Sequence, residues 1–245
     1  MKKLLTLLFS LFCIGLFAQE EFYVGLHYFT VKKEFQQEFI QQERKYYSKM
    51  HKASIDAGEK LGWDMWRVQD PFSNSDKYVT FCFAHLQEID KPLTPTDNNM
   101  FSKSEMSKVW ESRSKMIVKT QFIQTVFKGG FVPAEGTPPP KHLTLNFYDV
   151  DWTSSYDYEK MALSTVESKQ KSKYLKGWGL HKIVSKINDE ADYIAASFYD
   201  SPEDSYKRYI NTREPSAAQK ERGKKMQKML SLVRRENMQL VLFER

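Results

Sequence analysis

Cysteine is almost absent from this chain of 245 residues, which contains only Cys13 and Cys82. Cys13 lies in an apolar N-terminal stretch that we expect to be removed, so the remaining protein has one thiol and no intramolecular disulfide. About 225 residues bury a large enough core to fold without one. Cys82 stands in the apolar run YVTFCFAHL, which predicts a buried, unreactive thiol, because a reactive cysteine needs an open, electropositive setting.

The common sequence motifs of catalytic and cofactor-binding sites are also missing. The sequence has no HxH or HExxH metal spacing, no GxSxG nucleophile motif, no glycine-rich phosphate loop and no dinucleotide fingerprint. The five histidines stand apart in the chain, at His27, His51, His85, His142 and His181. No metal site is predicted, and the catalytic residues, if the protein has any, stay unknown at this stage.

Long hydrophobic runs are missing apart from one at the N-terminus. Lys2 and Lys3 precede an apolar run over residues 4–17, and Ala18 precedes polar Gln19. This pattern predicts a secretory signal over residues 1–18 and a periplasmic or extracellular protein. The run is shorter than the roughly 20 residues of a membrane span, although an uncleaved anchor stays open. Phe12 before Cys13 disfavours lipidation of that cysteine.

Positive charge is only slightly in excess. The net charge of +6 falls to +4 without the signal, which does not indicate nucleic-acid binding. Two Lys-rich segments, residues 169–176 and 219–228, are typical of solvated helix faces. Attraction to anionic lipid or polysaccharide is the alternative for these segments. No integral membrane segment is expected after cleavage.

A Pro- and Gly-rich stretch divides the chain into two similar parts. Glycines and three consecutive prolines interrupt residues 128–141, which predicts a linker over residues 133–140. The first unit would then span residues 19–132 and the second residues 141–245. In each, hydrophobic periodicity predicts the order β-α-β-β-α-β.

The two parts also match in spacing, which indicates an internal duplication. Trp63 lies fifteen residues before Tyr78, and Trp178 lies fifteen before Tyr193. The final helices match as well: Met106, Val109 and Trp110 have the spacing of Met226, Met229 and Leu230.

The order β-α-β-β-α-β is that of a ferredoxin-like unit, an α+β fold whose antiparallel sheet has helices on one face only. The open face needs a cover, and a second copy provides it. Here the chain resembles the dimeric α/β barrel superfamily, which includes antibiotic-biosynthesis-type monooxygenases, haem-degrading monooxygenases and stress-responsive barrels. The resemblance rests on element order over about residues 22–245 and implies a pseudo-dimeric barrel within one chain. We expect a monomer, or a weak homodimer.

A Gly-Trp pair marks the same junction in both units. Gly62 and Gly177 are expected to end the first helix of each unit in the left-handed conformation. Trp63 and Trp178 are then expected to pack between helix and sheet.

Alternation along the strands gives the candidate ligand-binding residues. His27 and Phe29 share one face of the first strand, and Phe81, Phe83 and His85 share one face of the third. Because these strands are central neighbours in the fold, we expect both histidines close together on one aromatic face, with Arg67 at its mouth. An ordinary pair of partly buried histidines is the competing interpretation.

Three functions remain open from the sequence. The first is non-enzymatic binding of a small hydrophobic or aromatic ligand in a barrel pocket, with no cofactor. The second is a monooxygenase-like or haem-handling enzyme that uses His27 and His85. The third is an interaction module of the cell envelope.

Overall fold

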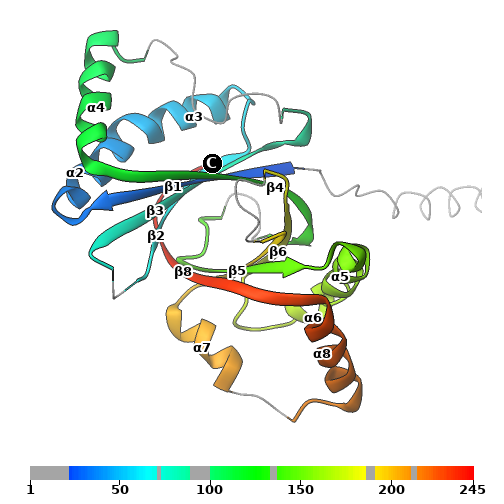
Figure 1. Ribbon diagram of the computed structural model, residues 1–245. Coiled ribbons are helices and arrows are strands. Elements are labelled where there is room, and N and C mark those ends of the chain that lie inside the picture. Colours follow the sequence, from blue (N-terminus) through cyan, green and yellow to red (C-terminus); the bar gives the residue numbers. More distant parts are fainter. Residues whose placement is uncertain (1–21, 71–72, 89–99, 133–136, 186–190, 211–213) are drawn as a thin grey trace, which may run out of the picture.

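The chain forms one closed barrel in the computed structural model (Figure 1). The structure describes residues 22–70, 73–88, 100–132, 137–185, 191–210 and 214–245. The predicted signal and half of the predicted linker lie outside these ranges. Among the described residues, no helix has the length and apolar character needed to cross a bilayer.

The first unit has the predicted order of elements. Its strands are β1 (Phe22–Lys32), β2 (Gly62–Val68), β3 (Ser75–His85) and β4 (Ile117–Phe131). Its helices are a 3-10 turn (Lys33–Phe35), α2 (Gln36–Gln42), a π-helical turn (Glu43–Tyr47), α3 (Ser48–Asp56), a 3-10 turn (Leu86–Glu88) and α4 (Lys103–Met116). The helical stretch over residues 33–56 is therefore continuous but overwound at its start and underwound in its middle.

The second unit repeats this order. Its strands are β5 (His142–Val150), β6 (Gly177–Ile183), β7 (Tyr193–Tyr199) and β8 (Leu230–Glu244). Its helices are a 3-10 turn (Trp152–Ser154), α5 (Ser155–Leu163), α6 (Val166–Gln170), α7 (Pro202–Ile210) and α8 (Ala217–Met229). The Ser201 hydroxyl accepts a hydrogen bond from the Asp204 N–H and so caps the start of α7.

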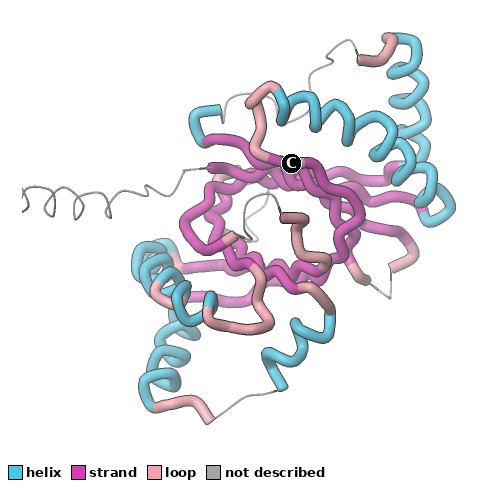
Figure 2. Tube along the Cα trace, turned by 180° about the vertical axis from the view of Figure 1, so that it is seen from behind, coloured by secondary structure: helices cyan, strands magenta, loops and turns pink. Residues whose placement is uncertain are grey.

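Eight antiparallel strands close in the order β1-β3-β2-β8-β5-β7-β6-β4. Each unit contributes four neighbours, β4-β1-β3-β2 and β8-β5-β7-β6, and the seams are β2 with β8 and β4 with β6. Figure 2 shows the strands as a ring with the helices of the two units on opposite sides. The ferredoxin-like, pseudo-dimeric α+β barrel is confirmed, and its closure leaves no sheet edge.

The apolar side chains form separate cores inside and outside the ring. Residues of both units meet in the lumen, including Leu26, Trp66, Phe81, Leu145 and Phe147. A second core lies between the first sheet and its helices, and a third lies under the helices of the second unit. Most strands thus have two covered faces along much of their length, which explains their nearly continuous apolar sequences, whereas β8 and the start of β4 are more exposed and more polar.

The glycines near these seams do not behave as the sequence indicated. Gly62 and Gly177 begin β2 and β6 and are buried; the left-handed residue after α3 is Gly58, with φ of 74°. Gly129 and Gly130, expected to interrupt the chain, continue β4 and pair with β6. The two tryptophans do pack as expected, with Trp63 fully buried and Trp178 nearly so.

Candidate functional site

His27 lies on the helix-facing side of β1, between two aromatic rings. Its register partners are Thr80 of β3 and Phe122 of β4. The imidazole centroid lies 4.2 Å from the Phe29 ring and 6.1 Å from the Phe122 ring. Unlike the core residues around it, His27 remains partly exposed. The predicted pairing of His27 with Phe29 is therefore present in the structure.

A buried ion pair lies next to this histidine. Arg113 of α4 and Glu43 of the π-helical turn approach to 2.7 Å, and both side chains are at least nine-tenths buried. The guanidinium carbon lies 5.2 Å from the centroid of the Phe29 ring and 4.3 Å from that of Tyr47. Arg113 occupies the apolar stripe of α4 with Val109, and a cation within such a stripe is the signal that sequence reasoning passed over.

Burial and charge keep the His27 imidazole neutral. Burial, and after it the positive charge of Arg113, lower the pKa of His27 from 6.5 to about 4. At neutral pH the ring therefore has one donor nitrogen and one acceptor nitrogen. A neutral imidazole near a buried guanidinium can accept a proton or a hydrogen bond while the cation stabilises a nearby negative charge.

The expected pairing of His27 with His85 is wrong. His85 is opposite Phe22, whereas His27 is opposite Thr80, so the two histidines fall on opposite faces of the sheet. Phe81 and Phe83 share the face of His85 and point into the lumen. The cause is strand register, because a one-residue difference in pairing moves a side chain to the other face.

The lumen contains a different histidine. His181 of β6 is buried and lines a small cavity with Phe81, Phe83, Phe198 and Thr125. Its Nδ1 lies 3.5 Å from the Thr125 hydroxyl, and burial lowers its pKa to about 4. Alternation in β6 was the available signal, because Trp178 and Leu180 face the helices and so direct His181 inward.

Among the described residues, the lumen cavity at His181 is too small for the ligand expected from the sequence. Its volume is about 30 Å³, which accommodates one or two water molecules. Sites for drug-sized ligands are typically about 300–1,000 Å³. The candidate site is therefore the helix-facing side of β1 at His27, where the imidazole stays partly exposed.

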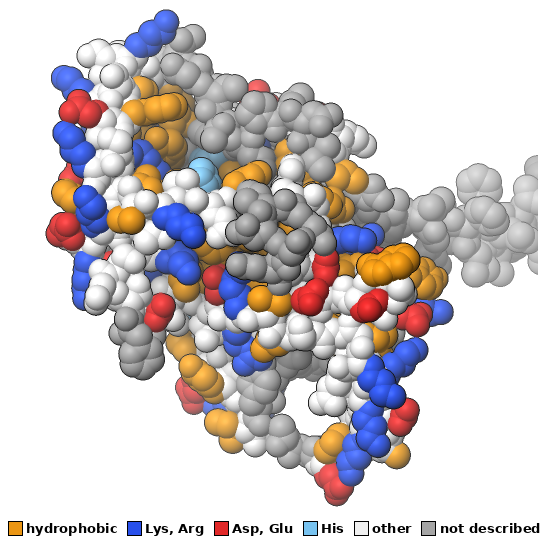
Figure 3. All heavy atoms as spheres, viewed as in Figure 1, with side chains coloured by type: hydrophobic (Ala, Val, Ile, Leu, Met, Phe, Trp, Pro, Cys, Tyr) orange, Lys and Arg blue, Asp and Glu red, His pale blue; other side chains and the backbone are white. Residues whose placement is uncertain are grey.

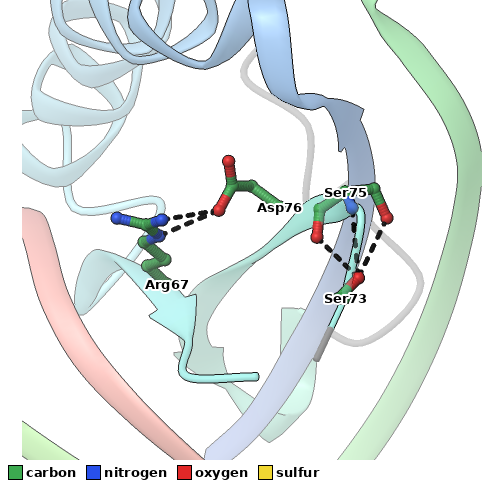
Figure 4. Close-up of polar contacts among 4 residues, drawn as sticks. All are labelled: Arg67, Ser73, Ser75 and Asp76. Atoms are coloured by element: carbon green, nitrogen blue, oxygen red, sulfur yellow. Dashed lines mark hydrogen bonds and ion pairs between the residues drawn. The ribbon is translucent and has the colours of Figure 1, made fainter. Parts of the chain in front are cut away.

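Arg67, predicted at the mouth of the pocket, is instead held at the end of β2. Its Nε and Nη2 donate to Asp76 Oδ1 at 3.1 and 2.6 Å (Figure 4). Ser73 and Ser75 bond to each other in the turn that leads into β3. This ion pair joins the ends of neighbouring strands and holds Arg67 away from the lumen cavity.

Haem, which the family resemblance implies, does not fit the described residues. The lumen at His181 lacks the volume for a porphyrin. At His27, Phe29 covers one ring face, and Arg113 opposes a further positive charge such as ferric iron. The described ranges also contain no group of three or more His, Cys, Asp or Glu side chains able to hold a metal ion.

Cys82 and His51 of the first unit are structural. Burial raises the pKa of the Cys82 thiol to about 12, as expected for an unreactive cysteine. His51 stacks on Trp63 with ring centroids 5.0 Å apart, and Lys60 Nζ lies 3.3 Å from its Nδ1. Neither residue shares the partly exposed position of His27.

The second unit has lost the histidine at the equivalent position. Asn146 is flanked by Ala195 and Arg235, as His27 is by Thr80 and Phe122. Arg235 Nε donates to the Asn146 amide oxygen at 2.7 Å, so this position is polar but already occupied by an internal partner. The difference places the candidate site in the first unit alone.

The low pKa values of His27 and His181 predict a loss of stability in acid. A histidine with a lowered folded-state pKa binds protons better when unfolded, so stability falls as pH drops from 6.5 toward 4. Between pH 7 and pH 5, we expect the His27→Asn variant to lose about 1–2 kcal/mol less of its free energy of unfolding than the unaltered protein loses. Urea unfolding at the two pH values measures this, and an unchanged pH dependence would contradict the assignment.

Comparison with known proteins supports the fold but not a particular function. No protein-family model and no curated protein matches the sequence. A candidate monooxygenase from Fusobacterium nucleatum is 11% identical, with a TM-score of 0.60 over 91% of this chain and 94% of that chain. An anthrone oxidase-like protein is 11% identical, with a TM-score of 0.57 over 92% and 93%. A haem-binding protein from Thermus thermophilus is 10% identical, with a TM-score of 0.50 over 90% and 91%.

Proposed function

We propose that the first unit binds a small aromatic ligand with an acidic hydroxyl group at His27, on the helix-facing side of β1. The observation that carries this proposal is the neutral imidazole between Phe29 and Phe122 with a buried guanidinium nearby. The Phe122 ring, which is partly exposed, offers a stacking surface to a flat ligand, while Phe29 is buried and supports the imidazole from the core side. The imidazole accepts a hydrogen bond from the ligand hydroxyl, and Arg113 stabilises negative charge on its oxygen.

A titration with 2-naphthol tests the binding. Because the second unit has asparagine at the equivalent position, His27→Asn is a replacement that this fold already accommodates. We expect it to weaken binding about five- to tenfold, the effect of losing one hydrogen bond. The control His142→Asn changes a partly exposed histidine of β5 and should leave affinity unchanged. Equal affinity of the two variants, or no binding by the unaltered protein, would exclude the proposal.

A catalytic role of the same site is the second candidate, favoured by the neutral state of His27. A base in this position converts a bound phenol or enol into its anion, the form that reacts more readily with dioxygen. The fold likeness to a candidate monooxygenase and an anthrone oxidase-like protein agrees with this chemistry. With anthrone in aerated buffer, we expect oxygen uptake that His27→Asn abolishes and His142→Asn retains. Absence of oxygen uptake would exclude the catalytic role and leave the binding function.

A further inference from the structure

Helix α8 is a basic helix that stands almost entirely in solvent. Of its thirteen residues only Met229 is buried, and only Arg222 and Met226 are half-buried. It has five basic residues, Lys220, Arg222, Lys224, Lys225 and Lys228, against the single acid Glu221. The helix therefore buries little apolar surface and carries an excess of positive charge, which packing against the barrel does not explain.

Contacts with α5 hold this helix in place. Arg222 Nη2 donates to the Met161 carbonyl oxygen and, at 2.6 Å, to the Ser164 hydroxyl. Lys225 Nζ lies 3.8 Å from Asp157 Oδ2. Lys220, at the other end, pairs with Glu214 at 2.8 Å. Lys224 and Lys228 form no hydrogen bond or ion pair with another described residue, so their charges face outward.

Two large aromatic side chains are exposed next to this charge. Trp152, in the 3-10 turn before α5, is 85% exposed, and Tyr156, in the first turn of α5, is 75% exposed. Figure 3 shows hydrophobic side chains over α5 that continue into a column of Lys and Arg side chains along α8 on the same side of the molecule. We call Trp152, Tyr156, Lys224 and Lys228 the α5–α8 ridge.

We propose that the α5–α8 ridge docks the protein on an anionic lipid surface. Tryptophan and tyrosine side chains favour the headgroup level of a bilayer, where the ring is buried and the polar tip stays hydrated. Lysines beside them gain from the negative surface potential of anionic lipids. A convex ridge suits a bilayer surface, whereas a protein partner typically fills a pocket or packs against a broad apolar patch. Asp157 and Glu221 oppose the docking, and Lys225 already pairs with Asp157.

Vesicle sedimentation of the full chain tests the proposal. The quantity compared is the ratio of partition coefficients on vesicles with about a third phosphatidylglycerol and on pure phosphatidylcholine. The apolar stretch over residues 4–17 is common to all variants and cancels in this ratio. We expect Lys224→Glu with Lys228→Glu to lower the ratio at least about 25-fold, fivefold for each lysine removed. Raising the salt from about 0.1 M to about 1 M should have a similar effect.

Matched changes on the first unit provide the control. Lys103→Glu with Lys108→Glu reverses two charges on α4 that have no ion pair among the described residues, and should leave the ratio within about twofold of that of the original chain. Trp152→Ala with Tyr156→Ala should weaken binding to anionic vesicles, whereas Trp110→Ala, also exposed, should not. Equal effects of the α4 and α8 reversals would overturn the proposal. So would retention on dextran sulfate without vesicle binding.

The ridge and the candidate site at His27 are independent. The ridge lies on the second unit, and none of its four residues contacts the candidate site. Loss of vesicle binding in the α8 variant with unchanged 2-naphthol affinity would support the ridge, whatever the outcome for His27.

Discussion

Replacing Arg113 with methionine is expected to lower the free energy of unfolding by about 3–5 kcal/mol. The substitution removes the only cation that approaches the Glu43 carboxylate among the described residues, and Glu43 is almost fully buried. Burial already raises the pKa of Glu43 despite the charge of Arg113. Without that charge, the carboxylate must either stay ionised in an apolar core or take up a proton.

The pH dependence identifies this cause. An acid with a raised folded-state pKa favours the folded protein below its unfolded pKa of about 4.5 and loses that contribution as pH rises. Arg113→Met should therefore be more destabilised at pH 7 than at pH 4 in urea titrations. The double variant Glu43→Gln with Arg113→Met should recover part of the loss at pH 7. If the single and double variants lose equal stability at both pH values, the buried charge is not responsible.

Replacing Gly130 with alanine is expected to lower the free energy of unfolding by at least about 3 kcal/mol. A Cβ at Gly130 would lie 2.0 Å from the Trp178 carbonyl oxygen, and its φ of 155° is rarely adopted by other residues. Since Gly130 pairs with Gly179 in the β4–β6 seam, the clash opens the barrel where the two units join. Chemical unfolding measures the loss, and failure to obtain folded protein agrees with it.

Gly223 provides the matched control. It lies within exposed helix α8, and an added Cβ there meets no atom within 4 Å. Gly223→Ala should raise the free energy of unfolding by about 0.5–1 kcal/mol, because alanine loses less entropy in a helix. Equal stabilities of the two variants would show that Gly130 is not under steric constraint.

Much of the fold is readable from the sequence because it depends on local patterns. Alternating and helical periodicity give the order of elements, and the matched spacing of Trp63 and Tyr78 with Trp178 and Tyr193 gives the duplication. A sheet with one uncovered apolar face needs a partner, which leads directly to the barrel. Trp110 shows the limit of the pattern, because it follows the apolar stripe of α4 but is 67% exposed.

The candidate site is only partly readable in this way. That His27 and Phe29 share a face follows from their spacing of two residues. The contribution of Arg113 and Glu43 does not, because it requires α4 to pack against the π-helical turn some seventy residues earlier in the chain. A π-helical turn has no sequence signal comparable to an apolar stripe.

The sequence alone determined the two ferredoxin-like units, their closure into a barrel and the burial of Cys82 and the Gly-Trp tryptophans. Only the tertiary structure decided which histidine faces which space. His27 lies under the helices, His85 is on the lumen side and His181 is inside the lumen, because the pairing register fixes the face of every side chain. Register arises from contacts between distant strands; alternation groups the side chains of one strand by face but does not say which residues of a neighbouring strand share that face.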